Sequence, residues 1–260
     1  MTRTISVALA CFALCAATAL AFMPSPVSAE IACEGAYGGH LQGIAVDEDA
    51  VYWSFTVDLV KTDRQGKLLA KVTVPGHHGD VTVHDGKLYC AVNRGQFNRE
   101  PGHADNWVYV FDADGLSLLA KHEIPEVVHG AGGMACHGGH FFVVGGLPEG
   151  YEENYVYEYD PEFRFVRRHV IRSGYTRLGI QTACFAHGSW WFGCYGNELL
   201  KTDESFKLLG KYDLDFGYGV VGLPDGKLLR GMSSRKDGRW TGAAAVVPMP
   251  APRPGADATK

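Results

Sequence analysis

The sequence has little that suggests helices, and its cysteines follow no metal-binding pattern. No segment places apolar residues at the 3.6-residue spacing of an amphipathic helix, which argues against a helical bundle or an α/β fold. The 7 cysteines include no C-x-x-C pair, so neither a zinc ribbon nor a thioredoxin-type redox site is indicated. We therefore expect an all-β fold.

Sequence motifs of several enzyme classes are also missing. The chain has no GxSxG, HExxH, Walker A or EF-hand pattern. The glycine-rich segment Gly130–Gly133 leads into an expected strand and not into a helix, so it is no nucleotide-binding fingerprint. The 24 Lys and Arg residues are outnumbered by 29 Asp and Glu and form no cluster, and we therefore expect no nucleic-acid partner.

The N-terminal segment has the composition of a secretory signal peptide. Arg3 supplies the positive start, Ile5–Ala21 is rich in Ala and Leu, and Val27–Ala29 fits a small-x-small cleavage site. The apolar run is shorter than the roughly 20 residues that a membrane span needs. We therefore predict that residues 1–29 are the signal peptide of a secreted or periplasmic protein without a membrane span; a membrane anchor is the alternative.

The rest of the chain divides into a domain and a tail. Residues 30–247 are long enough for one all-β domain with a sizeable core, and we expect this domain to be a monomer. Residues 248–260 are rich in Pro, Ala and Gly, a composition that predicts a disordered tail.

The domain contains an odd number of cysteines, namely Cys33, Cys90, Cys136, Cys184 and Cys194. An oxidising compartment permits disulfides, but the spacing gives no pairing, and we expect these residues mainly to be small buried apolar side chains. Cys136 and Cys184 are predicted to occupy equivalent positions on two innermost strands.

A repeated phrase organises the domain. Each copy has an apolar strand, a turn that begins with Asp, and a second strand that carries basic residues. The copies lie at Leu59–Val74, Tyr109–Ile124, Tyr157–Ile171 and Leu199–Leu214, and their turns begin at Asp63, Asp112, Asp160 and Asp203. Asp at the first turn position accepts hydrogen bonds from the following backbone, so each phrase predicts a hairpin.

A second repeated phrase, two apolar strands joined by a tight polar turn, precedes the first. Its five copies lie at Gly43–Phe55, Asp80–Val92, Gly133–Gly145, Thr182–Cys194 and Val220–Met232. The two phrases together give four antiparallel strands in each repeat of about 40–50 residues, which is the content of one propeller blade. The fifth copy is followed by a third strand near Thr241–Val247 but has no fourth, and we expect Ile31–Tyr37 to supply it and close the ring.

These repeats resemble the β-propeller superfamily, in particular secreted bacterial propellers with degenerate repeats of the YncE or NHL kind. The resemblance covers nearly all of residues 30–247 and implies a five-bladed β-propeller. It implies little about activity, because propellers host many chemistries.

Blade polarity predicts where a site would lie. The loops that lead into the innermost strands (the inner loops) and those that join the second and third strands (the middle loops) share one face of a propeller. Inner loops converge on the axis, so their side chains should meet in one pocket. Two middle loops, residues 93–106 and 145–154, are long, and long loops often carry function.

Residue chemistry on this face suggests three sets of candidates. Imidazole and phenol groups transfer protons, and guanidinium groups bind anions. The predicted catalytic residues are His78, His129, Arg177 and Tyr218. The predicted ligand-binding residues are Gln42, His77, Asp80, Asn93, Arg94, Tyr175, Tyr195 and Arg235. The predicted metal ligands are His40, His78, His129 and Gln181.

The histidines of the inner loops have three interpretations. They are interblade hydrogen-bonding residues, ligands of a divalent metal ion, or acid–base groups that act without a metal. The metal interpretation resembles propeller lyases for acidic sugars that hold a metal with three His and one Gln. In contrast, His84, His137, His140 and His187 fall at turns of the opposite face, and we interpret them as structural.

The same face is poor in carboxylates near the axis. A glycosidase needs two carboxylates across the scissile bond, whereas His, Tyr and Arg suit β-elimination from a uronic acid. The sequence therefore favours a propeller that binds a small polar ligand of the carbohydrate class and acts on it as a lyase. The alternatives are a non-catalytic scaffold for another protein and a metal-binding protein without turnover.

Overall fold

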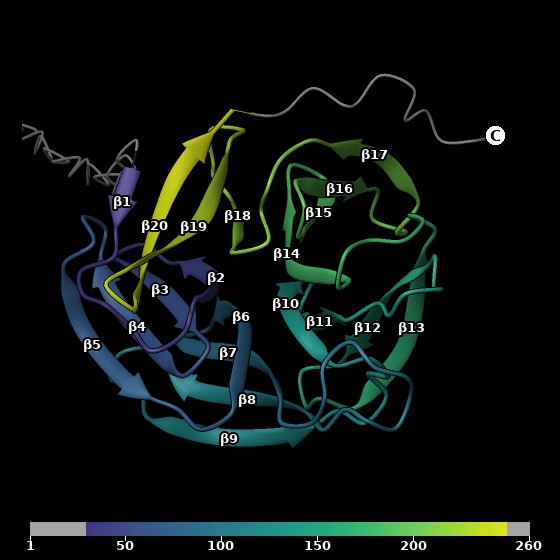
Figure 1. The fold of residues 1–260 in the computed structure, drawn as a ribbon, viewed down its shortest axis with the longest axis horizontal. Coiled ribbons are helices and arrows are strands. Elements are labelled where there is room, and N and C mark those ends of the chain that lie inside the picture. Colours follow the sequence, from purple (N-terminus) through teal and green to yellow (C-terminus); the bar gives the residue numbers. More distant parts are fainter. Residues whose placement is uncertain (1–29, 249–260) are drawn as a thin grey trace, which may run out of the picture.

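A computed structural model describes residues 30–248. They form five four-stranded antiparallel sheets set around a central axis (Figure 1). The fold is thus the all-β, five-bladed propeller that the repeats predict. The predicted signal peptide, residues 1–29, and all but the first residue of the predicted tail lie outside the described residues. Between residues 30 and 248, no helix could cross a membrane.

Each blade is a meander of consecutive strands, with one exception at the ends of the chain. Blade I contains β2 (Leu41–Val46), β3 (Ala50–Phe55), β4 (Asp58–Asp63) and β5 (Leu68–Thr73). Blade II contains β6 (His77–His84), β7 (Lys87–Asn93), β8 (Asn106–Asp112) and β9 (Leu118–Glu123). Blade III contains β10 (Ala131–His137), β11 (His140–Gly145), β12 (Asn154–Tyr159) and β13 (Phe165–Ile171). Blade IV contains β14 (Ile180–Ala186), β15 (Ser189–Cys194), β16 (Glu198–Thr202) and β17 (Leu208–Tyr212). Blade V contains β18 (Val220–Gly222), β19 (Leu228–Lys236), β20 (Arg239–Val247) and β1 (Glu30–Ala32).

Blade V joins the two ends of the described chain. Its strand order is β1-β20-β19-β18, and Ile31 of β1 lies opposite Ala244 of β20 (Figure 1). A further bridge pairs Tyr37 with Trp240. The expectation that Ile31–Tyr37 completes the fifth blade is confirmed, and the pairing covers the edge of β20 that would otherwise be open.

The Asp-led turns form as predicted. One carboxylate oxygen of Asp63 accepts hydrogen bonds from the backbone nitrogens of Gln65 and Lys67, each at 2.9 Å. Asp160 and Asp203 make the corresponding pairs of bonds in blades III and IV. These bonds fix the hairpin between the third and fourth strands, so the register of the outer strands is set locally.

The same turns place bulky apolar residues in an unusual backbone conformation. Leu116, Phe163 and Phe206 have φ angles of 57°, 59° and 68°, in the left-handed region that disfavours such side chains. All three are buried between blades, which offsets that cost. Blade I has Gly66 instead, where an added Cβ would lie 2.0 Å from the carbonyl oxygen of Ala32. The closing strand β1 therefore takes the space that a side chain fills in the other three blades.

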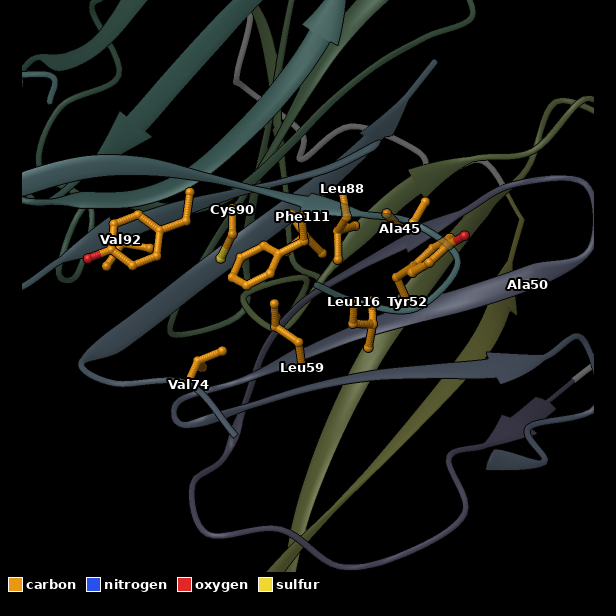
Figure 2. Packing of buried hydrophobic residues seen from close by; sticks show 13 residues of the cluster. Ala45, Ala50, Tyr52, Leu59, Val74, Leu88, Cys90, Val92, Phe111 and Leu116 are labelled. Atoms are coloured by element: carbon orange, nitrogen blue, oxygen red, sulfur yellow. The ribbon is translucent and has the colours of Figure 1, made fainter. Parts of the chain in front are cut away.

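The hydrophobic core is divided among the five junctions between neighbouring blades. Between blades I and II, Tyr52 and Leu59 pack against Leu88 and Phe111 (Figure 2). Each blade lies between two others, so both faces of its strands are covered, which explains the continuous apolar runs in the sequence. Burial of each large apolar side chain contributes about 1.5–3 kcal/mol.

The cysteines are free thiols throughout residues 30–248. Cys136 and Cys184 both lie on innermost strands, as expected, but their predicted equivalence is wrong by one residue. In the strand registers, Cys136 corresponds to Phe185, and Cys184 corresponds to Ala135. Side chains alternate along a strand, so Cys136 packs at the junction of blades II and III, and Cys184 at that of blades IV and V.

Candidate ligand-binding site

One pocket lies where the inner loops of three blades meet. Its volume is about 340 Å³, and we call it the tyrosine pocket. It is lined by His40 from the inner loop of blade I, Arg177 and Leu178 from that of blade IV, Tyr195 and Gly196 from the middle loop of blade IV, and Asp215 and Tyr218 from the inner loop of blade V. The structure thus brings together His40, Arg177, Tyr195 and Tyr218 of the predicted candidates, all from loops predicted to share a face.

The loop that carries Arg177 is held in a tight turn. The backbone nitrogen of Gly179 donates to Thr176 at 3.1 Å, and the Gln181 amide donates to the carbonyl oxygen of Leu178 at 2.7 Å. Gly179 has a φ of 75°, and an added Cβ would lie 2.1 Å from the carbonyl oxygen of Gly145. Gln181, predicted as a metal ligand, therefore shapes the wall of the tyrosine pocket.

The aromatic side chains of the pocket stand in a row. The rings of Tyr195 and Tyr218 lie 5.6 Å apart, and the His40 ring lies 5.9 Å from that of Tyr218, both pairs edge to face. Trp240 lies 5.5 Å from His40, and the Arg235 guanidinium sits 5.7 Å from the Trp240 ring. Arg235, predicted to bind ligand, is thus next to the pocket and not in its lining.

Burial and the neighbouring charged groups shift the pKa values of the two tyrosines in the pocket. Burial raises the pKa of Tyr195, and Tyr218 and Asp215 raise it further. Burial and Asp215 also raise the pKa of Tyr218, while Arg177 opposes them. Both phenols therefore stay protonated at neutral pH and can donate hydrogen bonds. Asp215 accepts a bond from the backbone nitrogen of Gly217 at 3.0 Å, which orients its carboxylate.

A polar group beside the pocket joins two of the predicted histidines. The side-chain nitrogen of Gln42 lies 3.3 Å from Nε2 of His40, 3.0 Å from Nε2 of His77 and 3.3 Å from the Thr56 hydroxyl. Gln42 is 4% exposed, whereas His77 reaches the surface. The predicted residues Gln42 and His77 thus adjoin His40, although neither lines the pocket.

His78 and His129 lie away from the tyrosine pocket. His78 is fully buried beside the Tyr109 ring, at 5.5 Å, and neither of its ring nitrogens has a hydrogen-bond partner in the described part of the chain. Burial lowers the pKa of His78 to about 3. The His129 Nδ1 donates to the carbonyl oxygen of Arg99 at 2.8 Å, and its ring packs on Tyr151. Neither histidine lines the tyrosine pocket.

Asp80 lies deep in the ring and away from the pocket lining. Its Oδ2 accepts a bond from the backbone nitrogen of Ala183, in blade IV, at 3.2 Å. An added Cβ at Gly43 would lie 1.9 Å from its Oδ1, so glycine is required there. Burial raises the pKa of Asp80. This carboxyl group links blades II and IV across the axis.

The remaining predicted ligand-binding residues belong to the long middle loops or the surface. Asn93 accepts bonds from the backbone nitrogens of Gly95 and Asp105, at 3.0 and 3.1 Å, and so closes the loop 93–106. Arg94 lies 4.0 Å from Asp105, and Tyr175 is 41% exposed. The structure does not bring these side chains to the tyrosine pocket.

The predicted metal ligands have separate surroundings. Across residues 30–248, no group of three or more His, Cys, Asp and Glu side chains is arranged to hold a metal ion. The set of four metal ligands stays a prediction. On the opposite face, His137 bonds Glu204 across two blades at 3.2 Å, in line with the structural role expected there.

A second pocket, of about 310 Å³, lies between blades III and IV. Its buried carboxylate, Glu158, accepts bonds from His140 Nδ1 at 2.7 Å, Arg167 Nε at 2.8 Å and His169 Nε2 at 2.7 Å. Since these polar groups already bond to one another, they leave few free partners for a ligand. We therefore place the candidate site in the tyrosine pocket.

Two polar or aromatic side chains near the candidate site are absent from the sequence-based candidates: Asp215, which lines the tyrosine pocket, and Trp240, which contacts His40 from outside the lining. Asp215 precedes Tyr218 in the inner loop of blade V, and this position could have identified it. Trp240 lies near the start of β20, and no repeat places it beside His40. Its position depends on the Tyr37 bridge that closes the ring.

Comparisons with known proteins agree with the architecture. No family model and no curated protein sequence matches the chain. The structure is similar to the crystal structure of Myxococcus xanthus glutaminyl cyclase, with a TM-score of 0.55 and 13% identity over 84% of this chain and 95% of that one. It is also similar to a gluconolactonase from Xanthomonas campestris, with a TM-score of 0.47 and 14% identity over 80% of this chain and 72% of that one. At 13% identity the likeness to the glutaminyl cyclase extends to the fold alone. The five four-stranded sheets around one axis make the chain a β-propeller.

Proposed function

We propose that this propeller binds a small acidic carbohydrate, such as a uronic acid, in the tyrosine pocket. The observation that carries the proposal is the convergence of one guanidinium, two phenols and one carboxylate from separate loops on a single cavity. A pocket of about 340 Å³ is in the range of small-molecule sites, which combine apolar or aromatic walls with a few polar groups.

The polar groups of the pocket are free to bind. Within residues 30–248, neither the Arg177 guanidinium nor the hydroxyls of Tyr195 and Tyr218 have a hydrogen-bond or ion-pair partner. A guanidinium binds a carboxylate through two parallel hydrogen bonds. Aromatic rings pack on the apolar face of a sugar, and phenols bond its hydroxyls. Asp215 would accept bonds from further sugar hydroxyls.

The same groups could support β-elimination. In that reaction the proton beside the carboxylate moves to Nε2 of His40, and the electrons of the broken C–H bond form a double bond. The C–O bond of the neighbouring carbon breaks, and Tyr218 donates its proton to the leaving oxygen. Arg177 would neutralise the carboxylate and so ease removal of the first proton. The likeness to a glutaminyl cyclase, an enzyme by name, is compatible with catalysis on this fold.

Replacing Arg177 with alanine should weaken binding of galacturonate and glucuronate oligosaccharides by about 10–100-fold, because a charge-assisted hydrogen bond contributes roughly 1.5–3 kcal/mol. Titration calorimetry measures this effect. The matched control is Arg172→Ala, since Arg172 lies in the same segment but pairs with Glu153 at 3.5 Å, outside the pocket. The control should bind as the parent does.

Equal affinity of Arg177→Ala and the control would contradict the proposal, as would equal binding of neutral oligosaccharides. Ultraviolet absorbance of an unsaturated product then separates a lyase from a binding protein. If no sugar binds, a scaffold role gains support. That role predicts that shortening the loop 93–106 abolishes binding of a protein partner while Arg177→Ala does not.

A further inference from the structure

The hairpin of β19 and β20 extends the ligand face beyond the tyrosine pocket. Its two strands have nine residues each, whereas the matching strands of the other blades have five to seven. Arg235 and Trp240 lie directly opposite each other near the end of this hairpin. Ser233, on the same side of β19 as Arg235, accepts a hydrogen bond from the backbone nitrogen of Leu41 at 3.1 Å. This bond joins the hairpin to blade I, and Trp240 thereby contacts His40.

Trp240 continues a line of aromatic side chains that begins in the tyrosine pocket. Four residues form this line, which we call the aromatic row: Tyr195, Tyr218, His40 and Trp240. Neighbouring rings lie between 5.5 and 5.9 Å apart, edge to face, and all four residues are partly exposed. Contiguous exposed apolar surface marks binding sites, and the apolar faces of sugar rings pack on aromatic side chains. The aromatic row therefore suits a chain of sugars that extends past the pocket.

A guanidinium lies at each end of the aromatic row. Arg177 lies at the Tyr195 end, where its side chain is 4.0 Å from the position that a Cβ at Gly196 would take. Arg235 lies at the other end, 5.7 Å from the centre of the Trp240 ring. A guanidinium that packs on an aromatic ring keeps its N–H donors available to an anion. Since the Arg235 guanidinium has no hydrogen bond or ion pair within residues 30–248, both ends of the row offer an unpaired cation.

The strand pairing directs only one of two adjacent cations toward the row. Successive side chains of a strand point to opposite faces. Lys236 follows Arg235 and therefore lies on the other face of the hairpin, opposite Arg239 in the strand register. Ser234 lies on that face as well, and its hydroxyl bonds the Thr241 hydroxyl at 2.7 Å. Lys236 thus carries the same charge as Arg235 on the same hairpin without facing the row.

We propose that Arg235 and Trp240 form a second subsite and that the ligand is an oligosaccharide of acidic sugars. One carboxylate binds Arg177 in the tyrosine pocket, and a second carboxylate, further along the same sugar chain, binds Arg235. The inference rests on the proposed function, because it extends the same site. A single uronic acid engages one guanidinium, whereas a chain that follows the aromatic row engages both. The second contact is intramolecular once the first has formed, so affinity should increase with chain length.

Titration calorimetry with galacturonate and tetragalacturonate tests the second subsite. The parent protein should bind tetragalacturonate at least about 10-fold more tightly than galacturonate. Arg235→Ala should weaken tetragalacturonate binding by about 10–100-fold, the effect of losing a charge-assisted hydrogen bond, and should leave galacturonate binding unchanged. Methyl esterification removes the charges of tetragalacturonate, so the parent and Arg235→Ala should bind the ester equally.

Lys236→Ala is the matched control, because it removes the same charge from the other face of the hairpin. It should bind tetragalacturonate as the parent does. Equal losses for Arg235→Ala and Lys236→Ala would overturn the second subsite. So would equal affinities of the parent for galacturonate and tetragalacturonate, or an equal loss of both ligands in Arg235→Ala. Failure of the proposed function has a different result: neither galacturonate nor tetragalacturonate binds to the parent.

Discussion

Replacing His78 with leucine should stabilise the protein, and the gain should grow as the pH falls. The pKa of His78 is about 3 in the folded protein and about 6.5 in the unfolded chain, so the unfolded state binds a proton first. Above pH 6.5 the His78 ring is neutral in both states and does not lower the free energy of unfolding. As the pH falls from 6.5 toward 3, the unfolded state gains a proton that the folded state does not, and the free energy of unfolding decreases. At pH 4.5, two units below the unfolded pKa, the free energy of unfolding is lower by about 3 kcal/mol, at about 1.4 kcal/mol per unit.

Leucine removes both the titrating group and the two ring nitrogens that have no partner in the described chain. Each buried unpartnered group costs about 1–3 kcal/mol, so some gain should remain at pH 8. Denaturant unfolding at pH 8 and pH 4.5, followed by tryptophan fluorescence, measures both effects. His103→Leu, at an exposed loop position, should change neither. Equal pH dependence of His78→Leu and the parent would refute this account.

The position of His78 depends on a feature of the strand pairing that the sequence does not show. The sequence contains two adjacent histidines, and successive side chains of a strand point to opposite faces. Which of them lies beside the ligand face depends on a register shift between His78 and Val81 in the pairing of β6 with β7. The inner strands of blades I, III and IV have a register shift at the corresponding point, but the repeated sequence pattern does not show it. The sequence therefore favours His78 as the catalytic residue, whereas the structure places His77 beside Gln42.

The fold itself could be predicted because its signals are local and repeated. Three of the four Asp-led turns are fixed by bonds to residues two and four positions later, and the turn at Asp112 by a bond to Gly115, so the turn forms even where the surrounding sequence differs. Blade polarity then placed His40, Arg177, Tyr195 and Tyr218 on one face. Side chains that depend on contacts between loops could not be placed. His129 is one example, since its partner Arg99 belongs to a middle loop that is distant in the sequence.

Replacing Glu158 with glutamine should destabilise the protein by about 2–3 kcal/mol at neutral pH. Burial raises the pKa of Glu158, but hydrogen bonds from Arg167, His169 and His140 outweigh burial and lower the pKa to about 2. A lowered pKa means that the stabilisation is present above the unfolded value of 4.5 and is lost as the pH falls through 2. Glutamine presents a donor to three groups that donate, so the cost resembles that of breaking a buried ion pair.

The matched control is Glu204→Gln, because Glu204 is exposed and its bond to His137 should contribute less than about 1 kcal/mol. Unfolding measured between pH 7 and pH 2 tests the prediction. The prediction would be contradicted if Glu158→Gln lowered the free energy of unfolding no more than the control does. It would also be contradicted if the dependence of that free energy on pH below pH 4.5 were unchanged.

The two titrating groups can be separated because they act in different pH ranges and at different blade junctions. His78 lies between blades I and II and Glu158 between blades III and IV, so their effects should add. Between pH 6.5 and 4.5 the His78 variant should change the slope of stability with pH, and between pH 4.5 and 2 the loss of the Glu158 carboxylate should change it as well. A double variant should therefore lose both contributions. Suppose instead that, below pH 4.5, the free energy of unfolding of the double variant changes with pH as steeply as that of one single variant. In that case the two blade junctions are coupled through the propeller and do not respond to acid independently.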